Sequence, residues 1–274
     1  MRNLIVGLAA LAAISGSTSL LAAPLAYDGF GDYPSGKYLG GVYHSADPAN
    51  DQAPLSGGFG FSGAWKTGNE YQPNYVVSTT ASPTYSSGSL SLATQAGYAT
   101  SNNEYTPGAS HTFDTSVTSA TGVAGTTVYT SFLMSTPNAY TSDSSFALYN
   151  GASSVFRIGK DWEAGNSYGG YPDGNVHFYV LKLAYDTTGS VAQTLFVDPS
   201  LAAEPSTGGI DLGTTTAFKF DSYKLYVEYS KPMVFDELRV GLSYSDVTPV
   251  PEPVMVSLVA LSGLFLASRR RRQV

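Results

Sequence analysis

Residues 175–185 place the tightest limit on how this chain can fold. They alternate as a β-strand does, and large apolar or aromatic side chains occupy both faces. A strand of this kind lies inside a sheet that other parts of the protein cover on both sides. Residues 186–190 (Asp-Thr-Thr-Gly-Ser) then predict a hairpin turn into a second strand, residues 193–197. We therefore expect a layered β-structure with this hairpin near its centre.

The rest of the body also has the features of β-structure. Short runs of β-branched and aromatic residues alternate with clusters of Gly, Pro, Asn and Asp, without a long apolar stripe of helical period. In residues 126–135, Val128, Phe132 and Met134 fall on one face. This pattern predicts an all-β fold, an antiparallel β-sandwich of two packed sheets. Further strands are expected at residues 26–30, 59–65, 75–79, 89–93, 111–113, 145–149, 154–159, 218–220, 222–228 and 234–242.

The last of these strands carries an unusual carboxylate. Asp236 falls on the apolar face of the alternating pattern, where it must be hydrogen-bonded, paired or metal-bound. Two interpretations stay open for Asp236: a structural hydrogen-bonding residue, or a calcium ligand. Glu237 and Arg239 share the opposite face and are expected to pair as solvated neighbours. The apolar face is formed by Val234, Leu238, Val240 and Leu242.

The N-terminus has the layout of an export signal. Arg2 supplies a positive start, residues 4–14 are apolar, and small residues follow up to Ala23. We predict a signal peptide over residues 1–23, cut between Ala22 and Ala26, which forms a helix before removal.

The C-terminus, residues 249–274, combines three chemistries in a fixed order. A proline-rich spacer containing Pro251, Glu252 and Pro253 precedes the apolar run 254–267. The run of about 14 residues is shorter than the roughly 20 that span a bilayer as a helix. A short hydrophobic helix stopped by cations suits a transient membrane anchor, and an ordinary membrane tail is the alternative. The cations are Arg269, Arg270, Arg271 and Arg272.

Composition narrows the function of the body between these ends. The chain has no cysteine, which excludes disulfides, thiolate metal sites and a cysteine nucleophile. Of 14 basic and 21 acidic residues, the two ends hold five and one, so the remaining nine and 20 give a net charge near −11. Such a body is not expected to bind nucleic acid, which requires Lys and Arg to neutralise phosphates. It is compatible with neutral glycans, with calcium, or with simple solubility.

The C-terminal order of Pro251-Glu252-Pro253, apolar helix and arginines resembles the PEP-CTERM sorting signal of Gram-negative bacteria. The resemblance implies recognition of the Pro-Glu-Pro end by exosortase, a membrane protease-transpeptidase that processes such tails. It also implies export, a transient stay in the inner membrane, and delivery to the cell surface, outer envelope or extracellular matrix.

The body, residues 24–248, contains a set of short motifs: Tyr27-Asp28-Gly29-Phe30, residues 57–65, Val197-Asp198-Pro199, residues 235–241 and residues 245–249. With these motifs the body resembles LamG-like domains of the concanavalin A-like jelly-roll type. This resemblance implies a sandwich whose first and last strands lie side by side. Members often bind glycans or act as adhesive modules, and relatives include glucanases.

The sequence offers little for catalysis. Glucanase relatives place carboxylates as Glu-x-Asp-x-(x)-Glu on one strand face, and none of the seven glutamates begins such a motif. Asp236 and Glu237 are adjacent and point to opposite faces of a regular strand. The histidines His44, His111 and His177 have no zinc-ligand spacing. We therefore expect no enzyme activity and no cofactor, apart from the open question of calcium.

The loop 159–175 is the best binding candidate. Aromatic rings stack on sugars, Asp and Asn bond hydroxyl groups, and glycines let a ligand approach the backbone. The alternative is a long hairpin loop whose aromatic residues pack onto their own sheet. The candidate glycan-binding residues are Trp162, Tyr168, Tyr171, Asp173 and Asn175.

Together these features predict an exported, exosortase-sorted, non-catalytic protein of the cell surface or matrix that binds glycan or exopolysaccharide. Two alternatives stay open. One is a divergent glycoside hydrolase or polysaccharide lyase of the same fold, and the other is a purely structural biofilm or surface component.

Overall fold

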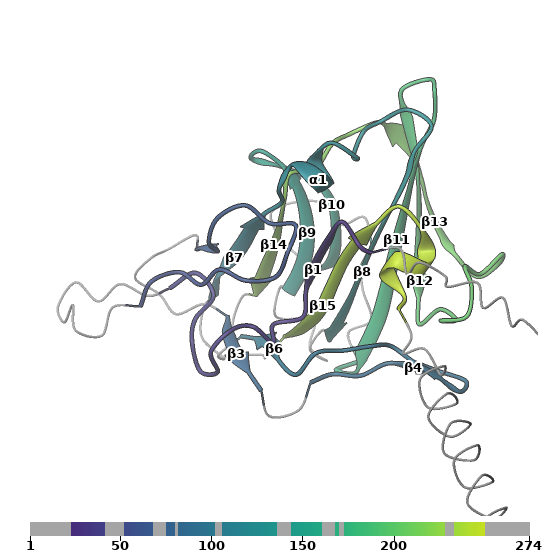
Figure 1. Ribbon diagram of the computed structural model, residues 1–274. Coiled ribbons are helices and arrows are strands. Elements are labelled where there is room, and N and C mark those ends of the chain that lie inside the picture. Colours follow the sequence, from purple (N-terminus) through teal and green to yellow (C-terminus); the bar gives the residue numbers. More distant parts are fainter. Residues whose placement is uncertain are drawn as a thin grey trace, which may run out of the picture.

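A computed structural model describes residues 23–41, 52–67, 75–79, 82–101, 106–135, 144–160, 168–169, 173–227 and 233–249. These residues form antiparallel β-sheets and two one-turn helices, α1 (Thr115–Thr118) and α2 (Tyr244–Val247), which confirms an all-β fold (Figure 1). The expected signal helix and the tail from Pro251 onward lie outside the described residues. Across the described ranges, no helix is both long and apolar enough to cross a membrane.

Two sheets face each other across the main core (Figure 1). A separate two-stranded hairpin consists of β4 (Ser86–Ser87) and β5 (Leu90–Ser91). The five-stranded sheet has the order β10 (Ser153–Lys160), β9 (Ser144–Asn150), β14 (Ser222–Val227), β7 (Thr106–Thr112) and β2 (Lys66–Thr67). The eight-stranded sheet has the order β13 (Ile210–Thr216), β12 (Ser190–Val197), β11 (Val176–Tyr185), β8 (Thr127–Ser135), β15 (Val234–Gly241), β6 (Tyr98–Thr100) and β3 (Val76–Ser78), and β1 (Ala26–Asp28) also pairs with β15.

β11 is a central strand covered on both sides, as its sequence predicts. It lies between β8 and β12, and the turn closes with Asp186 N donating to Ser190 O at 3.0 Å. Gly189 in that turn has φ of 86°, a conformation that favours glycine. Tyr179, Leu181 and Leu183 of β11 pack in the main core, together with Val128, Phe132 and Met134 of β8.

The opposite face of the eight-stranded sheet carries a second apolar cluster, which we call the outer cluster. It covers Phe178 and Val180 of β11 with residues from the β4–β5 region, from the segment after β12 and from α2. The eight-stranded sheet is therefore closed to solvent over this cluster. The buried members are Leu92, Tyr129, Leu133, Phe178, Val180, Phe196, Leu201, Tyr244 and Val247.

The first and last strands lie side by side, as the LamG-like resemblance implies. β1 pairs antiparallel with β15, with Ala26 opposite Val240 and Asp28 opposite Leu238. Leu25 N adds a hydrogen bond to Val240 O of 2.6 Å.

A buried polar network at Asp28 joins the two sheets. The Asp28 Oδ2 accepts hydrogen bonds from the hydroxyls of Tyr33 at 2.8 Å and Tyr223 of β14 at 3.4 Å. Trp65 Nε1 donates to the Tyr33 hydroxyl at 3.0 Å, and His111 Nδ1 of β7 lies 3.7 Å from Asp28 Oδ2. Trp65 and His111 are both buried.

Strict alternation in the last strand was a wrong prediction, because β15 contains a β-bulge. Its register against β8 shifts between Asp236 and Arg239, and Glu237 has φ of 57°. Phe235, Leu238 and Val240 consequently share the core face, whereas Val234 does not. Leu242 lies beyond the strand and is 51% exposed. An alternation rule places the core face wrongly wherever one extra residue enters a strand.

The Glu237–Arg239 pair exists, but it is buried rather than solvated. Arg239 lies over the Tyr27 ring, 4.7 Å from its centroid, and its guanidinium contacts Glu237 Oε2 at 2.5 Å. Glu237 Oε1 accepts from Tyr27 at 3.2 Å and from Gln95 N at 2.6 Å. The expected solvated neighbours therefore form part of the packing between β1 and β15.

Residues 56–64 form a glycine-rich loop, which we call the arch, and not the strand predicted at 59–65. Phe59 makes an isolated bridge with Tyr27 of β1, and Phe61 makes one with Phe113, which follows β7. The arch therefore connects β1 of one sheet to the residue that follows β7 of the other. The strand predicted at 218–220 is also absent, whereas β13 was not predicted.

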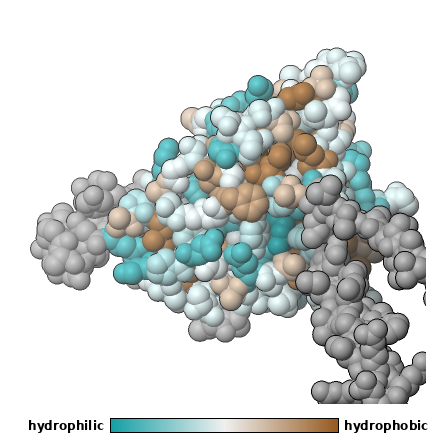
Figure 2. Space-filling view, viewed as in Figure 1, coloured by the Kyte–Doolittle hydropathy of each residue, from teal (hydrophilic) through white to brown (hydrophobic). Residues whose placement is uncertain are grey.

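The face that carries β1 and β15 is polar at its margins, and apolar residues gather across its middle and toward its top (Figure 2). Among the described residues the large apolar side chains with substantial exposure are Phe59, Val123 and Leu242.

Two glycines of the arch provide a matched test of its packing. A Cβ at Gly60 would lie 2.3 Å from Leu25 O, whereas a Cβ at Gly63 meets nothing within 4 Å, and both residues have positive φ. We expect Gly63→Ala to lower the free energy of unfolding by about 1 kcal/mol and Gly60→Ala by about 3 kcal/mol. Urea unfolding of the two variants measures the difference. Equal losses would show that the arch does not hold the sheets together through this contact.

Candidate functional site

The outer face of the five-stranded sheet differs from that of the other sheet. The residues of the five-stranded sheet that face the core are large and apolar or aromatic. The alternate residues of the same strands face outward and are small, hydroxylated or basic. No described residue of the outer cluster belongs to this sheet. The core-facing residues are Phe146, Leu148, Phe156, Ile158, Tyr223 and Leu225.

A row of outward residues crosses this sheet in register. Arg157 of β10 is opposite Ala147 of β9, and Ala147 is opposite Lys224 of β14. Lys224 is opposite Ser110 of β7, which in turn is opposite Lys66 of β2. Neighbouring strands are about 4.8 Å apart, so the backbones at Lys66 and Lys224 lie about 10 Å apart on either side of Ser110.

This part of the sheet is hollowed. A hollow of about 320 Å³ lies over β2, β7, β14 and the β9–β10 turn, and we call it the two-lysine hollow. Four hydroxyl-bearing residues contribute to its wall, and no carboxylate is found among its described lining residues. The lining consists of Lys66, Thr67, Gly108, Ser110, Tyr149, Gly151, Ala152, Ser222 and Lys224.

Tyr149 and Lys224 are held in position by their neighbours. The Tyr149 hydroxyl accepts a hydrogen bond of 3.1 Å from the guanidinium of Arg157, a residue that is buried. The Lys224 Nζ lies 5.6 Å from the centroid of the Tyr226 ring. A Cβ at Gly108 would come within 2.3 Å of Lys224 Cε, so the lysine stem lies over the bare backbone of this glycine.

Sequence reasoning did not identify this site. Polar residues alternate with apolar ones along β9 and β14, which is the signal that marks Tyr149, Ser222 and Lys224 as one outward face. No sequence pattern places Lys66, which lies more than 150 residues from Lys224 in the chain, opposite the same serine.

The predicted loop residues divide between the two sheets. Tyr168 makes an isolated parallel bridge with Ile158, so it lies along the edge of β10 in the five-stranded sheet. Asp173 and Asn175 precede β11 of the other sheet, and Asp173 accepts hydrogen bonds of 2.8 Å from both the backbone and the side-chain nitrogen of Asn175. Trp162 and Tyr171 lie outside the described residues. The structure therefore brings Asp173 and Asn175 together and leaves the glycan site predicted in this loop untested.

His177 connects Asp173 to the segment that follows β12. Its Nδ1 lies 2.6 Å from Asp198 Oδ2, and its Nε2 lies 3.2 Å from Asp173. Burial lowers the pKa of His177, but the contacts with Asp198 and Asp173 outweigh burial, so the pKa is raised. The hydrogen bonds from Asn175 lower the pKa of Asp173. This cluster therefore favours a charged imidazole between two carboxylates.

Asp236, the candidate calcium ligand, is fully buried. Its Oδ1 accepts from Glu237 N at 2.8 Å, while Oδ2 has no hydrogen-bond partner. Burial, and then the charge of Glu237, raise the pKa of Asp236 to about 10. Such a carboxyl group is neutral at physiological pH. Within the described part of the chain, no group of three or more His, Asp and Glu side chains is arranged to hold a metal ion.

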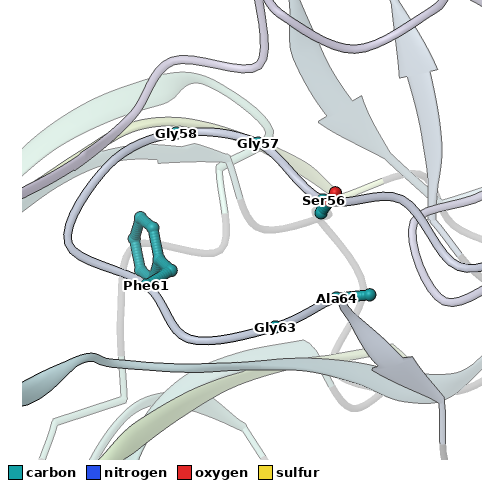
Figure 3. Close-up of a pocket in the computed structure, with 6 residues that line it drawn as sticks. All are labelled: Ser56, Gly57, Gly58, Phe61, Gly63 and Ala64. Carbon is teal, nitrogen blue, oxygen red and sulfur yellow. The ribbon is translucent and has the colours of Figure 1, made fainter.

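The arch encloses a second hollow, of about 510 Å³, whose wall is mostly backbone (Figure 3). The Phe61 ring points into this space and stacks on His111 at a centroid distance of 4.3 Å. Among its described lining residues, Ser56 alone has a polar side chain. This hollow therefore offers a ligand one aromatic edge and few polar groups, and we place the candidate site at the two-lysine hollow.

Stability should respond to pH through His177. A raised folded-state pKa adds stability that is complete below the unfolded pKa, near 6.5, and is lost as pH rises through the folded pKa. We expect the urea midpoint of the wild type to fall between about pH 6 and pH 8. His177→Gln should flatten that slope. The same slope in His177→Gln and wild type would contradict this account.

Replacing Asp236 separates its two interpretations. An acid whose pKa is raised from 3.8 to about 10 on folding loses stability as pH rises between these values. Asp236→Asn keeps the acceptor for Glu237 N and cannot ionise, so its stability at pH 8 should equal or exceed that of the wild type. Asp32→Asn, at an exposed site, is the control.

The urea midpoints of the wild type and of both variants are measured in the presence of calcium and in the presence of a chelator. Stabilisation of the wild type by calcium that is lost in Asp236→Asn would identify a calcium ligand and overturn the neutral-acid interpretation.

No protein-family model matches the chain, and no curated protein sequence matches it. Among solved structures it is similar to an endo-β-1,4-glucuronan lyase from the fungus Trichoderma reesei, at 11% identity over 67% of this chain and 96% of that chain, with a TM-score of 0.35. It is also similar to the CBM22-1 xylan-binding domain from Paenibacillus barcinonensis, at 11% identity over 81% and 96%, with a TM-score of 0.28. The match to the botulinum neurotoxin serotype G binding domain has 9% identity, covers 68% of this chain and 44% of that chain, and has a TM-score of 0.36. At these TM-scores the similarity supports no inference about function, which has to be derived from this chain's own residues.

Proposed function

We propose that this protein is a non-catalytic, glycan-binding protein of the bacterial cell surface or extracellular matrix, built on a concanavalin A-like jelly roll. The observation that carries the proposal is the open, hydroxyl-lined hollow on one sheet, while the outer cluster closes the other. Hydroxyls of Thr67, Ser110 and Ser222 can exchange hydrogen bonds with sugar hydroxyls. The ring of Tyr149 offers a surface for stacking.

The two ends of the chain supply the proposed route to the surface. A signal peptide over residues 1–23 would direct export, and the hydrophobic tail would hold the chain in the inner membrane. Exosortase would then act at Pro251-Glu252-Pro253. This route rests on the sequence.

The absence of catalysis is part of the proposal and is supported by burial. The carboxyl groups of Asp28, Asp236 and Glu237 lie on the paired strands β1 and β15, and all three are fully buried and cannot reach a polysaccharide. The described lining of the two-lysine hollow contains no carboxylate pair to act as acid and base.

One observation favours a second candidate, a polysaccharide lyase. The Tyr149 hydroxyl accepts a hydrogen bond from the Arg157 guanidinium, and Lys224 lines the same hollow. In β-elimination a deprotonated tyrosine takes the C5 proton beside a uronate carboxylate that a cation neutralises. The C4–C5 double bond then forms as the C4–O bond breaks, and the leaving oxygen takes a proton from the tyrosine or from water. Such a reaction leaves an unsaturated sugar that absorbs ultraviolet light.

Truncating Tyr149 tests the proposed glycan site. With the full chain in mild detergent, binding to the exopolysaccharide of the host is measured by affinity electrophoresis. We expect Tyr149→Ala to weaken binding about tenfold through loss of the stacking surface, and Tyr149→Phe to weaken it less. Tyr98→Ala, on the other sheet, is the control. A urea midpoint checks that each variant is folded.

Three other outcomes would contradict the proposal in different ways. Ultraviolet absorbance that grows with time and vanishes in Tyr149→Phe would identify a lyase. No binding by the wild type would favour a purely structural surface protein. Binding lost in Tyr98→Ala but kept in Tyr149→Ala would place the site elsewhere.

A further inference from the structure

We propose that the two-lysine hollow selects acidic polysaccharides, whose sugars carry carboxylates, over neutral ones. This inference rests on the proposed glycan-binding function and adds the chemical class of the ligand. Its basis is the placement of two cations, neither of which forms an ion pair with an anion among the described residues, in a hollow lined with hydroxyls.

The charge of the hollow is opposite to that of the body around it. Between the two predicted processed ends the chain has nine basic and 20 acidic residues, so most of the surface repels an anion. Two of these nine, Lys66 and Lys224, line the two-lysine hollow. Neither ammonium group forms an ion pair with any residue that the structure describes. Their charge is therefore available to an anion that enters from solvent.

Both carboxylate oxygens of Asp221 are hydrogen-bonded to residues that line the hollow. Asp221 Oδ2 accepts a hydrogen bond of 2.9 Å from Gly151 N, and its Oδ1 accepts one of 2.9 Å from the Ser222 hydroxyl. These bonds hold the β9–β10 turn against β14. Asp221 forms no ion pair with Lys66 or Lys224.

Lys224 is preorganised for a ligand. Its stem lies over Gly108, where even a methyl group would collide, and its Nζ is near the Tyr226 ring. Fixing a long side chain before binding reduces the conformational entropy that binding would otherwise cost. Lys66 is exposed on the short edge strand β2, on the other side of Ser110.

The arrangement fits an extended acidic chain better than other anions. The backbones that carry the two lysines are about 10 Å apart, which is close to the length of a disaccharide in an extended polysaccharide. Carboxylates on alternate sugars could therefore meet one lysine each, while Ser110 between them contacts a hydroxyl. Two lysines are too few for nucleic acid, whose binding scales with the number of phosphates neutralised. A neutral glycan would leave both cations without a partner.

The test compares one polymer in two charge states. The full chain is titrated with polygalacturonate and with its carboxyl-reduced derivative, which has the same backbone without the charges. We expect at least tenfold tighter binding of the acidic form, with an affinity that falls as salt is added. Lys66→Gln and Lys224→Gln should each weaken this binding about threefold, and the double variant about tenfold.

Matched variants exclude a general charge effect. Lys37→Gln with Lys219→Gln makes the same change of net charge at exposed positions outside the hollow and should leave binding within about twofold of the wild type. Lys66→Arg with Lys224→Arg keeps both charges and should bind the acidic polymer within about threefold of the wild type.

The outcomes separate this inference from the proposed function. Equal binding of both polymers, weakened by Tyr149→Ala but not by the lysine variants, would leave glycan binding in place and overturn the selection of acidic chains. Equal losses in the two double Gln variants would also overturn it. Binding of neither polymer nor the host exopolysaccharide would overturn both proposals.

Discussion

The buried carboxylate of Asp28 is the contact on which the stacking of the two sheets depends. Removing a carboxylate from water is costly, and the cost is offset only where donors reach it with good geometry. Here the donors come from both layers: Tyr33 follows β1, and Tyr223 belongs to β14 of the facing sheet. Burial and the neighbouring Asp28 charge raise the pKa of Tyr33 and of Tyr223, so both hydroxyls keep the protons that they donate. A shift of one sheet against the other would break these bonds inside the core, which makes the network a strong determinant of how the layers align.

The alignment leaves the two outer faces with different roles. The outer cluster seals one face with apolar side chains from the β4–β5 region and α2, so that sheet serves as the support. The other sheet keeps polar side chains outward in a regular cross-strand grid. A grid on a rigid sheet holds its functional groups at fixed spacing, whereas a loop does not, and fixed spacing is what recognition of a repeating polymer requires.

Much of the fold follows from local pattern, and the exceptions have physical causes. Several elements were predicted correctly: the central strand β11, its hairpin, and the apolar face of Val128, Phe132 and Met134. They could be predicted because residues that face the core of a β-strand recur at every second position of the sequence. The arch was mistaken for a strand because its phenylalanines alternate, although glycines at Gly58, Gly60 and Gly63 adopt positive φ. The bulge at Glu237 was missed because one inserted residue produces no recognisable pattern in the neighbouring sequence. β13 was missed because it lies at an edge and has little apolar content.

The candidate site was the least predictable part. The glycan site was predicted in the loop 159–175 because aromatic and polar residues are concentrated there. The structure describes three of the five candidate residues in this loop. The two-lysine hollow is built from β2, β7, β14 and a turn, so its residues become neighbours only through long-range pairing. Lysines on separate strands look like ordinary solvated charges until their register against Ser110 is known.

The pairing of β1 with β15 also affects how the protein acquires its structure. Tyr27 and Glu237, which bond across that pair, are 210 residues apart in sequence. β1 is synthesised before β15, so β1 stays unpaired until nearly the whole body has been synthesised. Folding should be slow and close late, since long loops must be ordered before the first and last strands meet. A chain whose first strand stays unpaired until its last strand arrives gains its final stability only when synthesis of the body is nearly complete.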